Sequence, residues 1–320
     1  MSATVRLLML IVLPAALLLL GGGGCDDKST VTPAARPRVV ATTTMIGDLV
    51  KSIGGDDVDL TVLIGPGVDP HTFKPSPADV ASLKRADLIF YNGLHLEGKM
   101  VDLFEQTLKE RSTAVTADVP PNQLLGWKGD GSDASGGAHD PHLWFDVKLW
   151  GIAARTIERR LTAHDPTKAA AFKQRGDALA AELAALDGDV RQKLATIPAG
   201  RRVLVTSHDA YNYFAKAYDI EVFGLQGIST ETEAGLANVG EAVRFIRERK
   251  IPAIFVESSV SPKTIERVRD DVRAAGGDVV IPGELYSDAL GAPGDHPGYD
   301  VHTYAGAMRY NVDLIVKALK

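Results

Sequence analysis

The sequence predicts an α/β protein with two lobes, each a parallel four-stranded sheet flanked by helices, joined by one long rigid helix. The first observation is that β-rich runs alternate with helical patterns from Arg38 onward, and that this alternation restarts at Arg202. Such alternation is typical of parallel sheets covered by helices on both faces. The second is an amphipathic stripe between the two series, and the third is the length of 320 residues, which is enough for two domains.

The first lobe is expected at residues 38–164. Its β-rich runs predict strands at Arg38–Thr42, Val58–Ile64, Asp87–Tyr91 and Thr113–Thr116. Helical patterns occur at Met45–Ile53, Pro77–Arg85, Met100–Glu110 and Phe145–Leu161. The segment Pro120–Ala138 is rich in Gly, Ser and Asp, so we expect a mobile surface loop there.

The linking helix is expected at residues 165–198. Its apolar residues step by three, four or seven and therefore form one stripe: Phe172, Leu179, Leu183, Leu186, Val190, Leu194 and Ile197. Pro166 suits a first helical turn, and Pro198 cannot continue the helix. A helix over Pro166–Ile197 would be roughly 48 Å long. Two ordinary helices broken at Gly188 are the alternative, which we favour less.

The second lobe is expected at residues 199–320, where the alternation of strands and helices restarts. Its predicted strands are Arg202–Thr206, Glu221–Gly224, Ala253–Glu257 and Asp278–Ile281. Its predicted helices are Ala210–Ala217, Leu236–Lys250, Pro262–Ala275 and Tyr304–Leu319.

The N-terminus predicts export. Arg6 precedes the apolar segment Leu7–Leu20, whose 14 residues are fewer than the about 20 that a membrane-spanning helix needs but suit a signal peptide. Cys25 follows four glycines and resembles a bacterial lipoprotein processing site, although Gly22 stands where leucine is usual. We therefore expect a signal peptide at 1–24, a lipid anchor on Cys25, a polar tether at 25–37 and an extracytoplasmic protein. A plain secretory signal is the alternative.

Composition narrows the function classes. The net charge of −6 gives no electrostatic reason to expect a nucleic-acid partner. The chain has 8 histidines and 1 cysteine, so an internal disulfide and a thiolate-rich zinc cluster are both excluded. Metal binding through imidazole remains open.

Three histidines occur in related loop contexts. Asp-Pro-His stands at 69–71 and again at 140–142, and His208-Asp209 closely follows a strand. Ligands of open parallel sheets bind beyond the carboxyl ends of the strands, and His71, His142 and His208 all fall there. The loop Gly283–Gly294 adds Asp288 on the same side. We predict that these four residues, two from each lobe, hold one metal ion.

Three imidazoles and one carboxylate suit zinc and also admit manganese. Four protein ligands leave no open position for a reactive water, which favours binding over hydrolysis. The remaining histidines are expected on the surface, with His139 a candidate for transient capture: His95, His139, His164, His296 and His302. Asp140 and Asp209 are expected to cap helices or orient histidines. Glu257 is expected to support the site or to be a structural partner.

The chain resembles the zinc- and manganese-binding solute-binding lipoproteins of ABC importers, the TroA-like (cluster A-I) family. The similarity runs from Val39 to the C-terminus. It is concentrated in the stretches Gly65–His71, Tyr91–Glu97, Asp140–Trp150, Arg202–Tyr213, Gly224–Thr230 and Gly283–Gly291. The resemblance implies two α/β lobes on a rigid helix, with His71, His142, His208 and Asp288 around one metal.

The resemblance also implies partners: a divalent metal as cargo, an ABC transporter permease, and the membrane through Cys25. We expect a monomer that is not an enzyme. His208 matches the zinc type, because some relatives that favour manganese have glutamate there. Pro120–Ala138 contains no histidine, unlike the histidine-rich loop of many zinc-specific relatives, so the metal's identity stays open.

Three alternative functions arise from the sequence. The first is a nucleotide-binding protein, because Gly93–Lys99 has the phosphate-loop spacing G-x-x-x-x-G-K. Met100, however, stands where the motif requires Ser or Thr. An exported zinc hydrolase needs an open metal position and a general base, and the sequence has neither H-E-x-x-H nor G-x-S-x-G. A metal-binding surface adhesin is compatible with the sequence as an added role.

Overall fold

The first half of the chain builds one parallel sheet with the order β2-β1-β3-β4. The computed structural model describes residues 35–127, 139–232 and 234–320. The strands are β1 (Arg38–Ala41), β2 (Asp59–Val62), β3 (Leu88–Tyr91) and β4 (Ser112–Ala114). All three pairings are parallel. The four strands predicted here are therefore confirmed, each slightly shorter than expected.

The second half repeats this arrangement as two strand pairs. They comprise β5 (Val203–His208) with β6 (Glu221–Gln226), and β7 (Val256–Glu257) with β8 (Glu284–Leu285). The backbone N–H of Phe255 donates to the carbonyl of Val205 over 2.9 Å and joins the pairs. The resulting order, β6-β5-β7-β8, matches that of the first sheet.

The predicted strand at Asp278–Ile281 is wrong in position. Within it, Val280 forms only an isolated parallel bridge with Ala253, and the regular pairing is made by β8 farther along. Pro282 lies between the two and lacks the N–H group that a continuous ladder needs.

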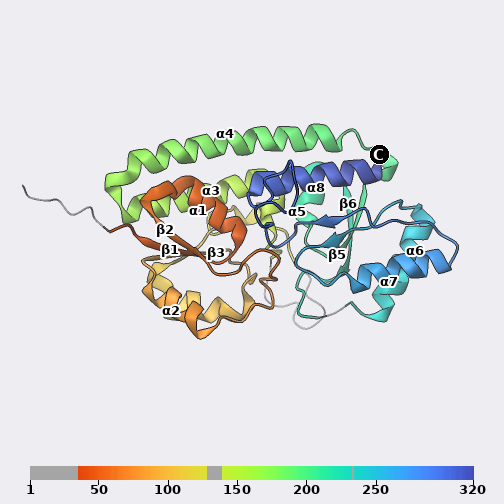
Figure 1. Cartoon of the computed structure of the whole chain (residues 1–320), viewed down its shortest axis with the longest axis horizontal. Helices are drawn as coiled ribbons and strands as arrows, with labels where there is room; N and C mark the ends of the chain where they lie inside the picture. The colour runs from red at the N-terminus through yellow and green to blue at the C-terminus, as the bar shows by residue number, and fades with distance from the viewer. Residues whose placement is uncertain (1–34, 128–138, 233) are drawn as a thin grey trace, which may run out of the picture. The chain divides into compact units, whose positions relative to one another are not determined.

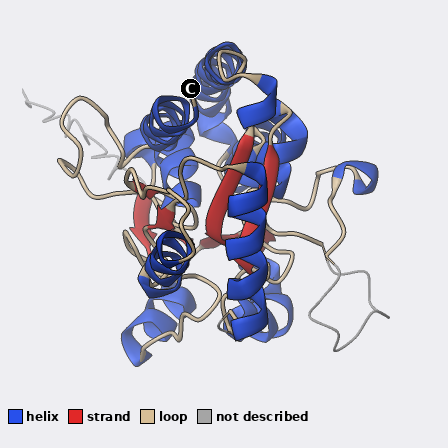
Figure 2. Cartoon of the chain, turned by 90° about the vertical axis from the view of Figure 1, so that its right-hand side faces the viewer, coloured by secondary structure: helices blue, strands red, loops and turns tan. Residues whose placement is uncertain are grey.

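Helices lie on both sides of the strands (Figure 2). Those of the first half are α1 (Thr44–Gly54), α2 (Pro77–Arg85) and α3 (Val147–His164). Those of the second half are α5 (Asn212–Tyr218), α6 (Leu236–Arg249), α7 (Lys263–Ala274) and α8 (Tyr304–Leu319). Helix α2 begins where predicted because Ser76 and Asp79 form a capping box around Pro77.

The linking helix α4 (Ala169–Leu194) runs past both sets of strands (Figure 1). A short 3₁₀ turn at Pro166–Lys168 precedes it. The helix is not broken at Gly188, so the single long helix is confirmed, although it ends before Ile197. It packs against α1 and α3 of the first half and α8 of the second.

The largest apolar core extends through both halves beneath α4. The rings of Phe145, from the first half, and Tyr211, from the second, lie 4.1 Å apart within this core. Separate apolar clusters fill the outer face of each sheet. Residues Arg36–Lys320 accordingly form one compact unit.

The predicted helix at Met100–Glu110 is irregular. A π turn at Leu103–Thr107 lies between 3₁₀ turns at Gly98–Met100 and Lys109–Arg111. Met100, Phe104 and Leu108 of this segment are nevertheless buried, and the ring of Phe104 stacks on Tyr91 at 4.8 Å. A helical sequence pattern does not distinguish an α-helix from this wider winding.

The expected signal peptide and Cys25 lie outside the described residues, as do residues 128–138 of the predicted loop. No helix in the described ranges is both long and apolar enough to cross a membrane.

Candidate metal centre

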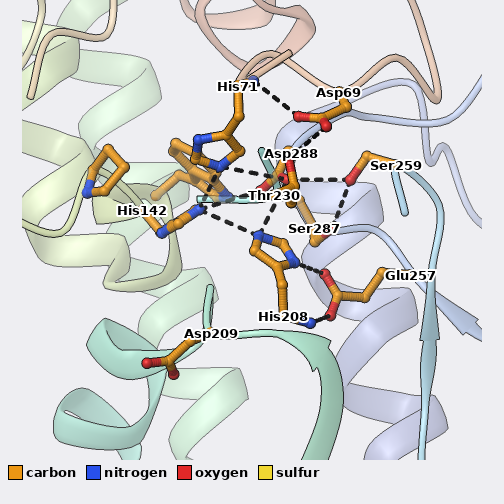
Figure 3. A network of polar contacts seen from close by, with 12 residues as sticks. Asp69, His71, His142, His208, Asp209, Thr230, Glu257, Ser259, Ser287 and Asp288 are labelled. Carbon is orange, nitrogen blue, oxygen red and sulfur yellow. Dashed lines mark hydrogen bonds and ion pairs between the residues drawn. The ribbon is translucent and has the colours of Figure 1, made fainter. Parts of the chain in front are cut away.

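The four predicted ligands meet at one point between the halves. Their ligand atoms all lie within 4.8 Å of one another, and all four residues are buried. Nε2 of His142 lies 3.2 Å from Nε2 of His71 and 3.4 Å from Nε2 of His208. The Asp288 carboxylate oxygens approach the three rings to 3.9, 3.6 and 3.3 Å (Figure 3). Three imidazole nitrogens and a carboxylate oxygen therefore surround a space of the size that one cation fills.

The parallel sheets bring these residues together at their carboxyl ends. His71 follows β2 and His142 follows β4. His208 is the last residue of β5, because this strand extends two residues beyond the predicted end at Thr206. Asp288 comes three residues after β8. The topological rule for open parallel sheets thus located all four residues.

The two Asp-Pro-His stretches share one local geometry. The carboxylate of Asp69 accepts the backbone N–H of His71 over 2.8 Å, and that of Asp140 accepts the N–H of His142 over 2.9 Å. This is an Asx-type turn, in which the acid fixes the backbone two residues on. The repeated motif therefore fixes the backbone that carries each histidine ring.

Two imidazoles have carboxylate partners on their far nitrogens. Nδ1 of His142 lies 2.7 Å from Oδ1 of Asp140, and Nδ1 of His208 lies 2.6 Å from Oε2 of Glu257. Such a partner fixes the ring so that Nε2 faces the metal and makes that nitrogen more basic. Glu257 also accepts the backbone N–H of His208 over 2.9 Å. The supporting roles expected of Asp140 and Glu257 are thus present in the geometry.

The fourth residue, Asp288, is positioned by hydroxyl groups. Its Oδ2 accepts a hydrogen bond of 3.2 Å from Ser259, whose hydroxyl lies 2.9 Å from that of Ser287. Its other oxygen, Oδ1, is buried and has no hydrogen-bond partner among the described residues. A buried carboxylate oxygen without a donor is costly, and a cation at the centre of the cluster would satisfy it. Ser259 lies in no motif of the sequence, and Ser287 lies in the stretch Gly283–Gly291 but was not predicted to position Asp288.

The surroundings shift the pKa values of the site's ionisable residues in different directions. Burial lowers the pKa of His71 to about 3, because an imidazolium would lose its hydration there. Burial also opposes charge on His208, but the carboxylates of Glu257 and Asp288 outweigh it and raise the His208 pKa well above 6.5. Burial would raise the pKa of Asp288, yet its histidine neighbours, His208 first, hold it below the usual range. The two carboxylates therefore favour the protonated form of His208.

The other histidines lie outside the cluster. His95, His164 and His302 are exposed, and His139 and His296 are partly exposed. Among the acids, Asp209 points away from the three rings (Figure 3). The helix nearest to it, α5, has no side-chain cap, so the capping or orienting role considered for Asp209 is not present.

The phosphate-loop match is accounted for by Glu97. Its buried carboxylate accepts the backbone N–H groups of Asn92 over 2.6 Å and Gly93 over 3.3 Å, and the hydroxyl of Thr42 over 2.7 Å. Backbone N–H groups of this kind are what a phosphate-binding loop offers its ligand. Here they are already taken by a carboxyl group of the chain itself.

Comparison with known proteins agrees with the fold and with a metal-binding role. The family model described as zinc-uptake complex component A, periplasmic, matches residues 39–318. The zinc-binding protein TroA of Treponema pallidum is 46% identical over 285 residues, covering 89% of each chain. A solved structure of periplasmic zinc-binding TroA superposes with a TM-score of 0.83 at 45% identity, covering 89% of this chain and 99% of that one.

Two further relatives extend the comparison. The manganese-binding lipoprotein MntA of Bacillus subtilis is 42% identical over 283 residues, covering 88% of this chain and 90% of its own length. The metal ABC transporter substrate-binding lipoprotein SsaB of Streptococcus sanguinis is 32% identical over 293 residues, covering 89% of this chain and 90% of its own. TroA and MntA are named as metal-binding proteins and SsaB as a substrate-binding lipoprotein of a metal ABC transporter, in agreement with the expectation of a binding protein that is not an enzyme.

Proposed function

Because the chain belongs to the family of periplasmic zinc-uptake component A proteins, we propose that it captures zinc in preference to manganese and delivers it to an ABC permease. It is a metal-binding substrate-binding protein of an ABC transporter. The observation that carries the proposal is the buried convergence of His71, His142, His208 and Asp288 from both halves. A lipid anchor at Cys25 would hold a monomer at the outer face of the membrane, where metal arrives and the permease lies.

The ligand chemistry supports zinc. Four-coordinate sites rich in imidazole are characteristic of zinc, whereas manganese favours more oxygen ligands and octahedral geometry. This site has three nitrogen donors and one carboxylate. The relatives divide between the metals, since TroA is named for zinc and MntA for manganese. The donor set therefore decides our proposal in favour of zinc.

Metal competition tests the preference. Protein stripped with a chelator is expected to bind one zinc ion per chain, and zinc is expected to displace bound manganese at equimolar concentration, because its affinity for nitrogen-rich sites is higher. Elemental analysis after dialysis against mixtures of the two metals measures this. Retention of manganese against equimolar zinc would reverse the proposed preference while leaving the metal-binding role intact.

We further propose that closure on the metal is a small tilt. The apolar core shared by the halves, with Phe145 against Tyr211 at 4.1 Å, would be exposed to water by a wide hinge motion. Helix α4 packs on elements of both halves and resists bending. Ligand atoms that already lie within 4.8 Å of one another need little further movement to enclose a cation.

Proton release is expected when the metal binds. The raised pKa of His208 means that its ring is protonated at pH 7 in the metal-free protein, and ligation requires the neutral form. His71, whose pKa is lowered to about 3, contributes no proton. We expect zinc binding at pH 7 to release about one proton from His208 and affinity to fall as pH decreases. Calorimetric titrations in buffers of different ionisation enthalpy count the protons, and a count of zero would contradict the protonation of His208.

A further inference from the structure

An open cavity borders the buried cluster at one residue. Its volume is about 330 Å³, and His71 is the cluster residue in its wall. The first half of the chain contributes Leu94, His95, Gly98, Trp127 and Pro141 to its wall, and the second half contributes Ile228, Ser229 and Glu231. A ligand histidine thus shares one cavity with an exposed histidine, His95, that the binding site does not use.

The backbone at His95 has an uncommon conformation. Leu94 and His95 both have positive φ angles, 54° and 63°, in the left-handed region that residues other than glycine seldom adopt. The buried carboxylate of Glu97 holds this turn by accepting the N–H groups of Asn92 and Gly93. Backbone strain that the surroundings maintain often marks a functional position. Here it places an imidazole at the wall of the cavity.

Contacts across the halves flank the same cavity. The hydroxyl of Thr230 donates to Asp69 over 2.5 Å, and Lys99 forms an ion pair of 2.6 Å with Glu231. Both contacts connect the short segment Thr230–Glu231 to loops of the first half. Asp69 also fixes the backbone of His71. The cavity therefore lies beside the contacts that would break if the halves separated, and it lies next to His71.

We propose that this cavity is the path by which metal reaches and leaves the cluster, and that His95 binds the ion transiently on that path. The inference rests on the proposed metal-binding function. Neutral imidazole is a common ligand for first-row metals. At the cavity wall it exchanges for part of the ion's hydration shell before the ion reaches His71, which lowers the barrier for passage in both directions.

A group that acts only on the path changes rates and not the equilibrium. Removing the His95 imidazole is therefore expected to slow association and dissociation by the same factor. The factor is about tenfold if the barrier for passage rises by about 1.4 kcal/mol. The dissociation constant stays unchanged, because the bound state does not contain His95. A structural role would instead change the affinity or the stability.

Asparagine and aspartate provide matched variants. Both tolerate the left-handed conformation, so neither adds strain at this position. His95→Asn removes the metal-binding ring, whereas His95→Asp replaces it with a carboxylate that binds zinc. We expect slow exchange in the asparagine variant and rates near those of the wild type in the aspartate variant. His164→Ala removes another exposed histidine, at the end of α3, and is expected to leave both rates unchanged.

Stopped-flow tryptophan fluorescence with zinc alone measures association, since the ring of Trp144 lies 5.2 Å from that of His142. Mixing the zinc-loaded protein with a chelator measures dissociation. Unchanged rates in His95→Asn would overturn the proposal, as would weaker affinity with unchanged association. Failure of the wild type to bind zinc at equilibrium would instead reject the proposed function, so the two ideas are tested separately.

Discussion

Replacing His208 with alanine is expected to weaken zinc binding roughly a hundredfold. Zinc sites with four protein ligands bind with about 10–16 kcal/mol at pH 7, or about 3 kcal/mol per ligand, and 1.4 kcal/mol corresponds to a tenfold change. His208 is a fully buried candidate ligand, with Nε2 3.3 Å from Asp288 and 3.4 Å from His142. Equilibrium titration against a chelator of known affinity measures the loss.

The matched control for this variant is His164→Ala, which removes an exposed histidine at the end of α3. That residue lies outside the cluster, so the equilibrium affinity of the control is expected to equal that of the wild type. Because the loss of His208 leaves the buried Glu257 without its imidazole partner, circular dichroism must confirm that the variant is folded. Equal loss of affinity in the two variants, both folded, would mean that the cluster is not the binding site.

The fold was predictable where local and long-range signals agree. The capping box at Ser76 fixes the start of α2 from its own residues, and the apolar stripe from Phe172 to Leu194 favours the one continuous helix that the structure contains. Prediction failed where one pattern fits two backbones. The predicted helix at Met100–Glu110 has Met100 in a 3₁₀ turn and Phe104 in a π turn, since residue spacing alone does not distinguish these windings from an α-helix.

The candidate site was predictable because its ligands follow strands. Residues at the carboxyl ends of parallel strands share one edge of each sheet, which places His71, His142, His208 and Asp288 together without knowledge of their side-chain geometry. The supporting groups were harder to find. Ser259 and Thr230 are common residues in loops without a motif, and only the folded chain brings them to Asp288 and Asp69.

Replacing Glu257 with glutamine is expected to weaken zinc binding by about 10–100-fold at pH 8, because carboxylate partners of ligand histidines contribute on this scale. Glutamine keeps an oxygen that can accept the backbone N–H of His208, but it removes the charge beside Nδ1, 2.6 Å away. The same charge raises the pKa of His208. Protons therefore compete less with zinc for His208 in the variant. The difference in zinc affinity between the variant and the wild type is expected to shrink as pH falls from 8 to 6.

This pH dependence separates two roles of Glu257. A group that only supports the fold would lower affinity by a constant factor at every pH, or would leave it unchanged. A group that acts on the imidazole changes both its basicity and its proton affinity, so the affinities of the two proteins converge in acid. Glu221→Gln, which removes an exposed carboxylate paired with Arg249 over 2.7 Å, is the control and is expected to follow the wild type throughout. Affinities measured from pH 6 to 8 decide between these roles, and parallel curves would refute the action of Glu257 on His208.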